Sequence, residues 1–321
     1  MKALWLAAVL AVSSIFGAHA QTYPSRPITI IVPFPAGGPT DTIARLVADR
    51  MKESLEQPLV IENVTGAGST IGTTRAIQAA PDGYTLYVGN WTSSVGANVL
   101  YPVSWHIVND LEPVARLSTS SLMIVGRSGL PPKDVRELID WLKANPGKAS
   151  AVHIGAGSGA HVCYLYFGQK TGVTFQLVPY RGGAPGMQDL IAGHVDLFCA
   201  EASQTLAGVR AGQIKAYAVM SDTRWAPLPD VPALQEIGLD LQLAFWHGLW
   251  APKGTPKDIV QKLNAAVVAA FKDATVQKRI AELGQTIPTD DQLTPEALGA
   301  WHKAEIDKWW PFIKAANIKV N

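Results

Sequence analysis

Apolar residues along the chain follow two alternating spacings, one typical of buried strands and the other of helices. Residues 28–32 form a short run rich in β-branched side chains, which predicts a strand. After a turn rich in Pro and Gly, Ile43, Leu46, Val47 and Met51 repeat at helical spacing in a segment that begins near residue 40. The same order of strand, Gly-rich turn and helix recurs in both halves of the chain.

This alternation predicts an α/β fold in which mostly parallel sheets are flanked by helices. The predicted strands are 28–32, 59–64, 84–88, 122–125, 151–154, 175–178, 195–199 and 214–220. The predicted helices include one from about residue 40 and those at 135–144, 259–271, 276–283 and 295–313. About 300 residues suffice for two lobes of roughly 100–150 residues each. In such folds ligands bind outside the carboxyl ends of the strands, so the turns there are candidate binding groups.

The N-terminus has the pattern of a secretory signal peptide at residues 1–20. Lys2 supplies a positive charge, residues 3–16 are mostly apolar, and Ala18-His19-Ala20 is a small-x-small cleavage site. A buried N-terminal helix is the alternative, but a polar, Pro-containing stretch follows at once. No later stretch has eighteen uninterrupted apolar residues, so we expect an exported, periplasmic chain that does not span the membrane.

Charge and cysteine content argue against several classes of function. The chain has 27 Lys and Arg against 26 Asp and Glu, and this balance argues against a nucleic acid partner. No cluster of Cys and His has the spacing of zinc ligands, so we expect no metal and no other cofactor. Cys163 and Cys199 are an even pair in an oxidising compartment, which allows one disulfide or two free buried thiols.

Three Gly-rich turns, at 34–41, 155–161 and 180–185, each precede a predicted helix. A helix N-terminus carries unpaired N–H groups and a partial positive charge, and glycines let a ligand approach the backbone closely. We therefore predict a carboxylate cradle, although each turn alone also fits an ordinary strand-to-helix connection.

Several side chains near these turns have two interpretations each. Asp41 caps its own helix or contacts the ligand, and Arg181 pairs with a ligand carboxylate or with a surface acid. Trp91 and Trp246 form walls of the cleft or belong to the core. Glu201 contacts a cation or hydroxyl of the ligand, or lies on a solvated face.

Two enzyme classes fit the second turn poorly. Gly155-x-Gly157-x-x-Ala160 fits a relaxed dinucleotide-binding pattern, but the acid expected at the end of the next strand is missing. Ser158 with His161 suggests a serine hydrolase, yet alanines replace both flanking glycines of the nucleophile elbow. Ser158 also stands where a helix N-cap is expected. We therefore predict a binding protein and not an enzyme.

A series of motifs extends over essentially the whole mature chain. The first is Pro33-Phe34-Pro35-Ala36-Gly37-Gly38-x-x-Asp41-x-x-Ala44-Arg45. The others are Gly66-Ala67-Gly68, Pro81-Asp82-Gly83-Tyr84, Pro179-Tyr180-Arg181-Gly182, Gly193-x-Val195-Asp196, Leu228-Pro229-Asp230-Val231-Pro232 and Gly248-Leu249-Trp250-Ala251-Pro252. In these motifs and in their order, the sequence resembles the Bug/TctC family, the periplasmic receptors of tripartite tricarboxylate transporters.

The resemblance implies a two-lobed type-II periplasmic binding protein fold with hinge crossovers near residues 117–125 and 242–250. Lobe 1 would comprise residues 21–120 and 246–321, and lobe 2 residues 121–245. It further implies a monomeric receptor that closes around a small carboxylic acid and delivers it to the membrane subunits of a transporter. The acid would be a di- or tricarboxylate, an amino acid or an aromatic acid. The alternatives are a ligand-presenting sensor for a two-component kinase and an exported serine hydrolase.

The resemblance also transfers candidate ligand contacts, residue by residue. They are Phe34, Ala36, Gly37, Gly38 and Asp41 in the first turn, Asn90, Trp91 and Thr92 after the third strand, and Ser158, His161, Arg181, Gly182, Ala184, Ala200 and Glu201 in the second lobe. Trp246 joins them as a candidate cleft wall.

The sequence departs from the family pattern at two of these candidates. The family often has an acid five positions after Val195, where this chain has Ala200 followed by Glu201. Trp91 stands where a smaller or polar residue is common, and it suggests an aromatic acid or a tightly bounded small one. No particular ligand is transferred. The two cysteines resemble a pair found in part of the family, which implies a disulfide that fastens lobe 2.

Overall fold

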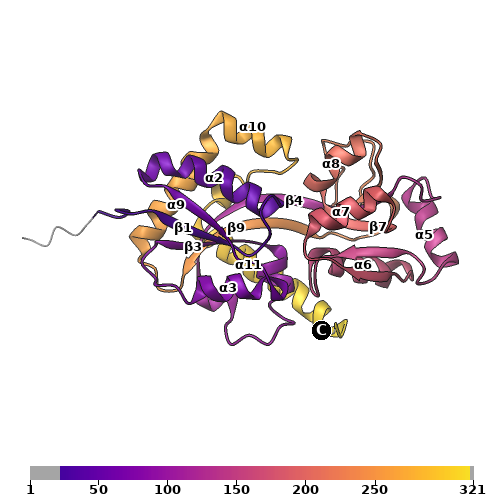
Figure 1. Ribbon diagram of the computed structural model, residues 1–321, viewed down its shortest axis with the longest axis horizontal. Coiled ribbons are helices and arrows are strands. Elements are labelled where there is room, and N and C mark those ends of the chain that lie inside the picture. Colours follow the sequence, from indigo (N-terminus) through magenta and orange to yellow (C-terminus); the bar gives the residue numbers. More distant parts are fainter. Residues whose placement is uncertain (1–21, 319–321) are drawn as a thin grey trace, which may run out of the picture.

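The computed structural model describes residues 22–318 of the chain, and the predicted signal peptide lies outside this range. Two lobes lie side by side, each a sheet flanked by helices (Figure 1). The long strands β4 and β9, described below, run from one lobe toward the other and join the two sheets (Figure 1). The predicted two-lobed α/β fold is confirmed.

The sheet of the first lobe has the strand order β2-β1-β3-β9-β4. Its strands are β1 (Ile28–Val32), β2 (Leu59–Asn63), β3 (Thr85–Asn90), β9 (Ala244–Pro252) and the first part of β4 (Leu111–Arg127). β1 pairs in parallel with both β2 and β3, whereas β9 is antiparallel to β3 and β4. The carboxyl ends of β1 and β3 therefore meet at one edge of this sheet.

The sheet of the second lobe has the order β4-β7-β5-β6, with β8 on the other side of β4. Its strands are β5 (Ser150–His153), β6 (Gln176–Pro179), β7 (Leu197–Glu201), β8 (Ile214–Val219) and the second part of β4. β5 pairs in parallel with β6 and β7, and β4 is antiparallel to β7 and β8. In both lobes the antiparallel pairs all involve β4 or β9.

β4 belongs to both sheets and is the most extensive connection between them. Residues 111–121 of this strand pair with β9, and residues 122–126 pair with β7. The sequence predicted only 122–125 as a strand, so its first eleven residues were missed. The predicted crossovers at 117–125 and 242–250 fall on β4 and β9. The lobe boundaries at 120/121 and 245/246 stay a prediction.

Helices cover both faces of each sheet. They are α2 (Pro39–Leu55), α3 (Thr70–Ile77), α4 (Ile107–Asp110), α5 (Val135–Ala144), α6 (Gly159–Thr171), α7 (Gly183–Ala192), α8 (Ala202–Arg210), α9 (Lys257–Lys272), α10 (Ala274–Glu282) and α11 (Pro295–Ala315). The short turns are η2 (Ala67–Ser69), η3 (Thr92–Gly96), η4 (Leu234–Ile237) and η5 (Asp290–Gln292), of which η3 is π-helical. Helices α5 to α8 lie in the second lobe, at the right of Figure 1, and α2, α3, α9 and α10 lie in the first.

Two hydrophobic clusters stabilise the fold. One lies among β1, β3, β4, β9, α2 and α9 in the first lobe. The other fills the second lobe and continues through Trp91, Trp246 and Trp250 to α11. α11 packs on β4 and on η3, and so places the C-terminal part of the chain against both crossing strands. This second cluster holds the region next to the cleft rigid.

Candidate functional site

A partly open cavity lies where the carboxyl ends of strands from both sheets meet. Its volume is about 90 Å³ for the centre of a water-sized sphere. It is lined by Phe34, Pro35, Ala36, Gly38, Pro39, Thr40, Asn90, Thr92, Leu122, Ile154, Gly159, Ala160, Gly182, Gly183, Ala184, Pro185, Phe198, Cys199, Ala200, Glu201, Gln204 and Phe245.

The first wall is the turn between β1 and α2, followed by the N-terminus of α2. Pro39 occupies the first helical position, where a missing N–H group costs nothing. Gly37 has φ +78°, a left-handed conformation that favours glycine, and its N–H donates to Asp41 Oδ2 at 2.8 Å. Neither Gly37 nor Asp41 lines the cavity, in contrast to the prediction, because both are used to hold the turn in shape.

Asp41 is the buried support of this turn. Its carboxylate accepts hydrogen bonds from Arg45 Nε at 2.9 Å and from Asn63 Nδ2 at 2.9 Å, and Asn63 also donates to the Phe34 carbonyl. Burial acts to raise the pKa of Asp41, but the hydrogen bonds from Arg45, Gly37 and Asn63 outweigh it and the pKa is lowered. Asp41 is therefore ionised and fixes the position of the turn from behind.

A chain of neutral hydrogen bonds links the polar side chains on the first-lobe side. Asn90 Nδ2 donates to Thr40 Oγ1 at 2.8 Å, and Thr40 Oγ1 lies 3.2 Å from His247 Nε2. His247 Nδ1 in turn lies 3.1 Å from Ser118 Oγ. Burial lowers the pKa of His247 to about 3, so its ring is neutral. The chain orients Thr40 and Asn90, both of which line the cavity.

The N-terminus of α6 forms part of the second wall. Ser158 is its N-cap, and its Oγ accepts from the main-chain N–H of His161 at 3.3 Å. His161 Nδ1 accepts from the Gly157 N–H at 3.4 Å, and burial, with the charge of His153 second, lowers the His161 pKa to about 4. The two side chains are buried behind the wall, and Gly159 and Ala160 line it instead. Ser158 and His161 therefore do not form the predicted cavity contacts, nor a nucleophile–base pair.

The N-terminus of α7 completes the second wall. Gly182, Gly183, Ala184 and Pro185 line the cavity, whereas the Arg181 side chain is exposed and does not. Arg181 was predicted as a carboxylate partner, but the turn directs it to solvent. A Cβ atom on Gly182 would lie 3.3 Å from Pro35 Cγ, so the turns of the two lobes nearly touch here.

Three helix N-termini, those of α2, α6 and α7, thus point main-chain N–H groups at one cavity. The N–H groups of Thr40, Ala160, Gly183 and Ala184 have no hydrogen-bond partner among the described residues. No lysine or arginine of the described residues lines the cavity. Positive potential there comes from the helix N-termini, which suit an anion.

Residues 43–318 match the family described as the tripartite tricarboxylate transporter family receptor, TctC. The chain belongs to this family. The Bug/TctC resemblance of its sequence motifs is thereby confirmed.

Three solved structures are similar to the chain over most of its length. MatC from Rhodopseudomonas palustris, with bound malate, is 37% identical with a TM-score of 0.86, and the match covers 91% of this chain and 100% of MatC. The periplasmic binding protein BugD is 37% identical with a TM-score of 0.86, and the match covers 92% and 99%. Another R. palustris protein, with adipate, is 30% identical with a TM-score of 0.86, over 92% and 99%. The family and these neighbours are solute-binding proteins.

Two tryptophans that were predicted as cleft walls lie in the core of this TctC-family protein. Trp91 is fully buried, donates from Nε1 to Glu305 Oε2 at 2.9 Å and packs edge-on against Trp309. Trp246 is also fully buried, between Trp250 and His302. Both face α11 and the core rather than the cavity, so Trp91 gives no information on the shape of the ligand.

Four large apolar residues of the lining were not singled out by the sequence as ligand contacts. They are Leu122, Ile154, Phe198 and Phe245. Phe198 lies in the predicted strand 195–199 and Leu122 in 122–125, and neither strand carries a polar signal that marks its cavity side. Gln204 on α8 was also missed. The predicted Ala200 and Glu201 do line the cavity.

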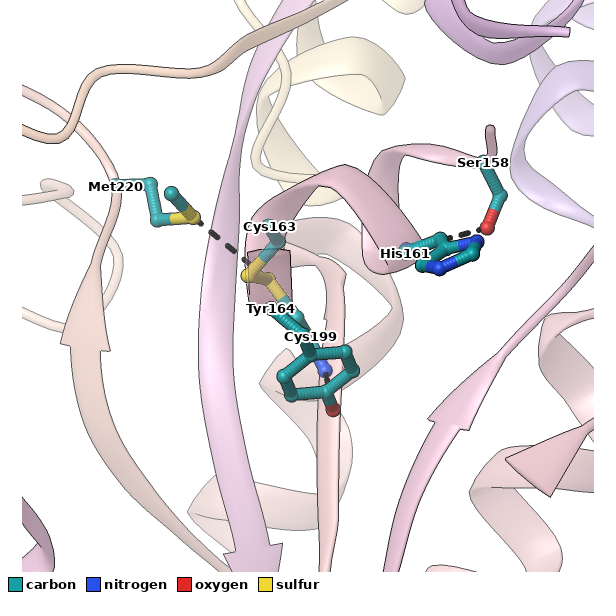
Figure 2. Close-up of a disulfide and its surroundings, with 6 residues drawn as sticks. All are labelled: Ser158, His161, Cys163, Tyr164, Cys199 and Met220. Carbon is teal, nitrogen blue, oxygen red and sulfur yellow. Dashed lines mark hydrogen bonds between the residues drawn. A yellow bond between two sulfur atoms is a disulfide. The ribbon is translucent and has the colours of Figure 1, made fainter. Parts of the chain in front are cut away.

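A disulfide joins the second-lobe wall to the helix behind it. Cys163 on α6 is bonded to Cys199 on β7, with a Cα–Cα distance of 6.5 Å (Figure 2). The Cys199 N–H donates to the Tyr164 hydroxyl at 2.6 Å, and Met220 Sδ lies 3.7 Å from Cys199 Sγ (Figure 2). The disulfide implied by the family resemblance is confirmed, and Cys199 itself lines the cavity.

Within residues 22–318, no helix has the length and apolar character needed to cross a membrane. In the same range, no group of three or more His, Cys, Asp or Glu side chains is placed to hold a metal ion.

Proposed function

We propose that this protein is a periplasmic receptor that captures a small dicarboxylic acid by closing its two lobes and delivers it to a tripartite tricarboxylate transporter. The observation that carries the proposal is the convergence of three helix N-termini on one cavity that no cationic side chain of the described residues lines. Two similar proteins of the family have malate and adipate bound, and both acids are dicarboxylates. We expect the receptor to be exported by its signal peptide and to act as a monomer.

The hydrogen bonds of such a cradle supply enough binding free energy for a micromolar transport receptor. A charge-assisted hydrogen bond contributes about 1.5–3 kcal/mol, and four main-chain donors are free. A micromolar dissociation constant corresponds to about −8 kcal/mol. Four donors therefore reach this range after part of their energy is offset by the loss of rotational and translational freedom.

The small size of the cavity favours a short, unbranched acid. A cavity of this volume fits a backbone of a few carbons with two carboxyl groups. The apolar lining by Leu122, Ile154, Phe198 and Phe245 fits the methylene part of such an acid. A tricarboxylate or a large aromatic acid fits less well.

A thermal-shift screen of ligand-free mature protein tests the proposal. The panel contains malate, succinate, adipate, citrate, aspartate, glutamate and benzoate. An acid at a hundred times its dissociation constant adds about 2.7 kcal/mol of stability, which raises the melting temperature by several degrees. We expect this shift for one or more dicarboxylates. No shift with any acid contradicts the proposed function.

Ala184→Glu is the variant that tests the cradle. The new carboxylate lies in the first turn of α7, where an acid favours the helix, but it also competes with the ligand for the N–H groups. We expect the protein to fold and the ligand-induced shift to disappear. Gln188→Glu is the matched control, because it adds the same charge on the exposed side of the same helix, away from the cavity. A full shift in Ala184→Glu would place the ligand elsewhere.

A further inference from the structure

Among the described residues that line the cavity, Glu201 is the one ionisable side chain. The other polar side chains there are those of Thr40, Asn90, Thr92 and Gln204, all neutral. Cys199 lines the cavity as well, but it is part of the disulfide. A site with the features of an anion cradle therefore contains an acid and no base, and this combination needs a physical explanation.

Glu201 lies where the two lobes meet. It is the last residue of β7 and precedes α8, it pairs across the sheet with Leu122, and its exposure is 5%. Gln285 Nε2, in the segment after α10 of the first lobe, donates a short hydrogen bond to Glu201 Oε1. Glu201 Oε1 thus forms a hydrogen bond between the two lobes. Glu201 Oε2 has no hydrogen bond to a described residue.

The groups packed around Glu201 are uncharged. Gln285 contacts it from the first lobe, and Ser203 and Gln204 follow it on α8. On the crossing strands, Leu122 is apolar and the buried His247 ring is neutral. Burial raises the pKa of Glu201 to about 8, and the nearby Ser203 and Gln285 side chains, which act to lower it, do not prevent this. In this arrangement of the lobes the side chain is therefore a neutral carboxylic acid at pH 7.

An anionic ligand in the same cavity strengthens this preference. Two like charges in a buried site of low polarity repel each other strongly, whereas a neutral carboxylic acid can donate a hydrogen bond to a carboxylate. We propose that Glu201 closes onto the ligand as a neutral acid, donates a hydrogen bond from its carboxyl group to a carboxylate of the ligand, and so captures the acid together with one proton. This inference rests on the proposed function. It identifies Glu201 as the side chain that favours ligands with a carboxylate at this position.

The competing interpretation is that Glu201 is ionised and pairs with an ammonium group of an amino acid. The hydrogen bond from Gln285 is compatible with both forms of Glu201. The neutral surroundings favour the protonated form of Glu201. An ammonium group of a ligand would lose its hydration shell on entering the cavity, and no second anionic side chain lines the described part of the cavity to compensate for this loss. The two interpretations predict opposite proton exchange on binding and can be separated.

The sign of the pH dependence follows from the two states of the cleft. In an open cleft water reaches Glu201, and its pKa lies near the ordinary value of 4.5; in the closed form it is about 8. Between these values closure takes up a proton, so the affinity is highest at low pH and falls as the pH rises, by up to about tenfold per pH unit. At pH 7 the uptake is about 0.9 proton per ligand.

Isothermal titration calorimetry with malate and adipate tests the inference. Titrations at pH 6.0, 6.5, 7.0 and 7.5, each in two buffers of different ionisation enthalpy, measure the affinity and the number of protons exchanged. Above pH 6 carboxyl groups with ordinary pKa values are ionised, so the ligand itself contributes little. For the wild-type protein we expect uptake of nearly one proton and an affinity that falls by about tenfold or more across this range.

Two matched variants assign the effect. Glu201→Gln keeps an acceptor for Gln285 and a donor for the ligand but cannot titrate, so its affinity should not vary with pH and its proton uptake should vanish. Glu305→Gln removes a second buried acid whose pKa is also raised by burial, but Glu305 bonds Trp91 in the core and does not line the cavity. This variant should keep the wild-type pH dependence.

Each outcome decides between the interpretations. Wild-type binding of malate or adipate with no proton uptake and a flat pH profile overturns the inference while the proposed function stands. Tight binding of aspartate in the same titration, without proton uptake and with loss in Glu201→Gln, supports the ammonium interpretation and also overturns it. If neither these titrations nor the thermal-shift panel shows binding of any acid, the proposed function fails and the inference fails with it.

Discussion

At the scale of single residues, the cavity offers an anion main-chain N–H groups in place of lysine or arginine. The donors of Thr40, Ala160 and Gly183 are fixed by the helices to which they belong. A fixed donor loses no side-chain rotamers on binding and does not titrate, so its contribution is preorganised. The side chains behind the turns therefore matter because they hold these donors in place.

Asp41 is the clearest of these supports. We expect Asp41→Asn to reduce the free energy of unfolding by about 1–3 kcal/mol at pH 7, because it removes a buried charged acceptor of three hydrogen bonds. The folded-state pKa is lowered, so the stabilisation is present above the ordinary value of 3.8 and is lost as the pH falls through the folded pKa. Urea unfolding at pH 7 and pH 3 should show a difference between wild type and variant that shrinks at pH 3.

The control for this experiment is Asp49→Asn on the same helix. Asp49 pairs with Lys52 and its side chain is 74% exposed, so its loss should change the stability by less than about 0.5 kcal/mol. Equal effects of the two substitutions, or a difference that does not depend on pH, would contradict the role of Asp41.

The sequence predicted the turns that line the cavity but not which side chains face it. Phe34, Gly38, Thr92 and Ala184 line the cavity as predicted, because the turn itself brings them there. Trp91 comes directly before Thr92, yet it points into the core, where its partner Glu305 is 214 residues away in the chain. Side-chain direction at a strand end depends on such long-range packing, and local sequence does not contain it.

At the scale of elements, the predicted strands and helices agree with the structure where a hydrophobic pattern is regular. β1 and α5 have the predicted bounds, 28–32 and 135–144. β4 was predicted over only a few residues, because Pro113, Ser118 and Ser120 interrupt the apolar pattern of its first part. That part is stabilised by antiparallel pairing with β9, more than a hundred residues later. A pairing between distant segments leaves no periodic signal in either one.

The disulfide fastens α6 to β7, the two elements behind the second wall. Replacing both Cys163 and Cys199 by alanine should lower the free energy of unfolding by roughly 2–4 kcal/mol, because the bond closes a loop with a sequence separation of 36. Urea unfolding with and without a reductant measures the effect. The reductant should destabilise the wild type by a similar amount and leave the double variant unchanged. The assignment would be contradicted if the reductant changed the stability of the double variant. It would also be contradicted if the wild type, after unfolding and refolding in the reductant, kept its full stability.

At the scale of the whole molecule, three contacts among the described residues join the two lobes beside the cavity, in addition to the approach of Gly182 to Pro35. The Gly159 N–H donates to Thr92 Oγ1 at 3.1 Å, and Gln285 donates to Glu201. At the third place the backbones themselves meet, because a Cβ atom on Gly96 would lie 1.9 Å from the Gly157 carbonyl oxygen. We infer that this arrangement is the closed form, in which η3 of the first lobe abuts the turn between β5 and α6 of the second.

Gly96→Ala should therefore act as a wedge that disfavours closure. Gly96 lies inside the helical turn η3 and has no positive φ, so alanine suits its backbone. Its methyl group would clash with the Gly157 carbonyl oxygen of the other lobe, and it would also lie 2.8 Å from Trp91 Cζ3, a core side chain of its own lobe that must shift. Ligand binding depends on closure, and we expect the affinity for malate or adipate to fall more than tenfold. The shift of Trp91 should in addition lower the melting temperature of the ligand-free variant. Gly299→Ala is the control, since its Cβ would meet Pro113 at an ordinary 3.5 Å.

Small-angle scattering with saturating acid should show a decrease in radius of gyration for wild type and control, and none for Gly96→Ala at the same concentration. An unchanged affinity in Gly96→Ala would mean that the ligand is bound without this contact, and the described arrangement would not be the ligand-bound one.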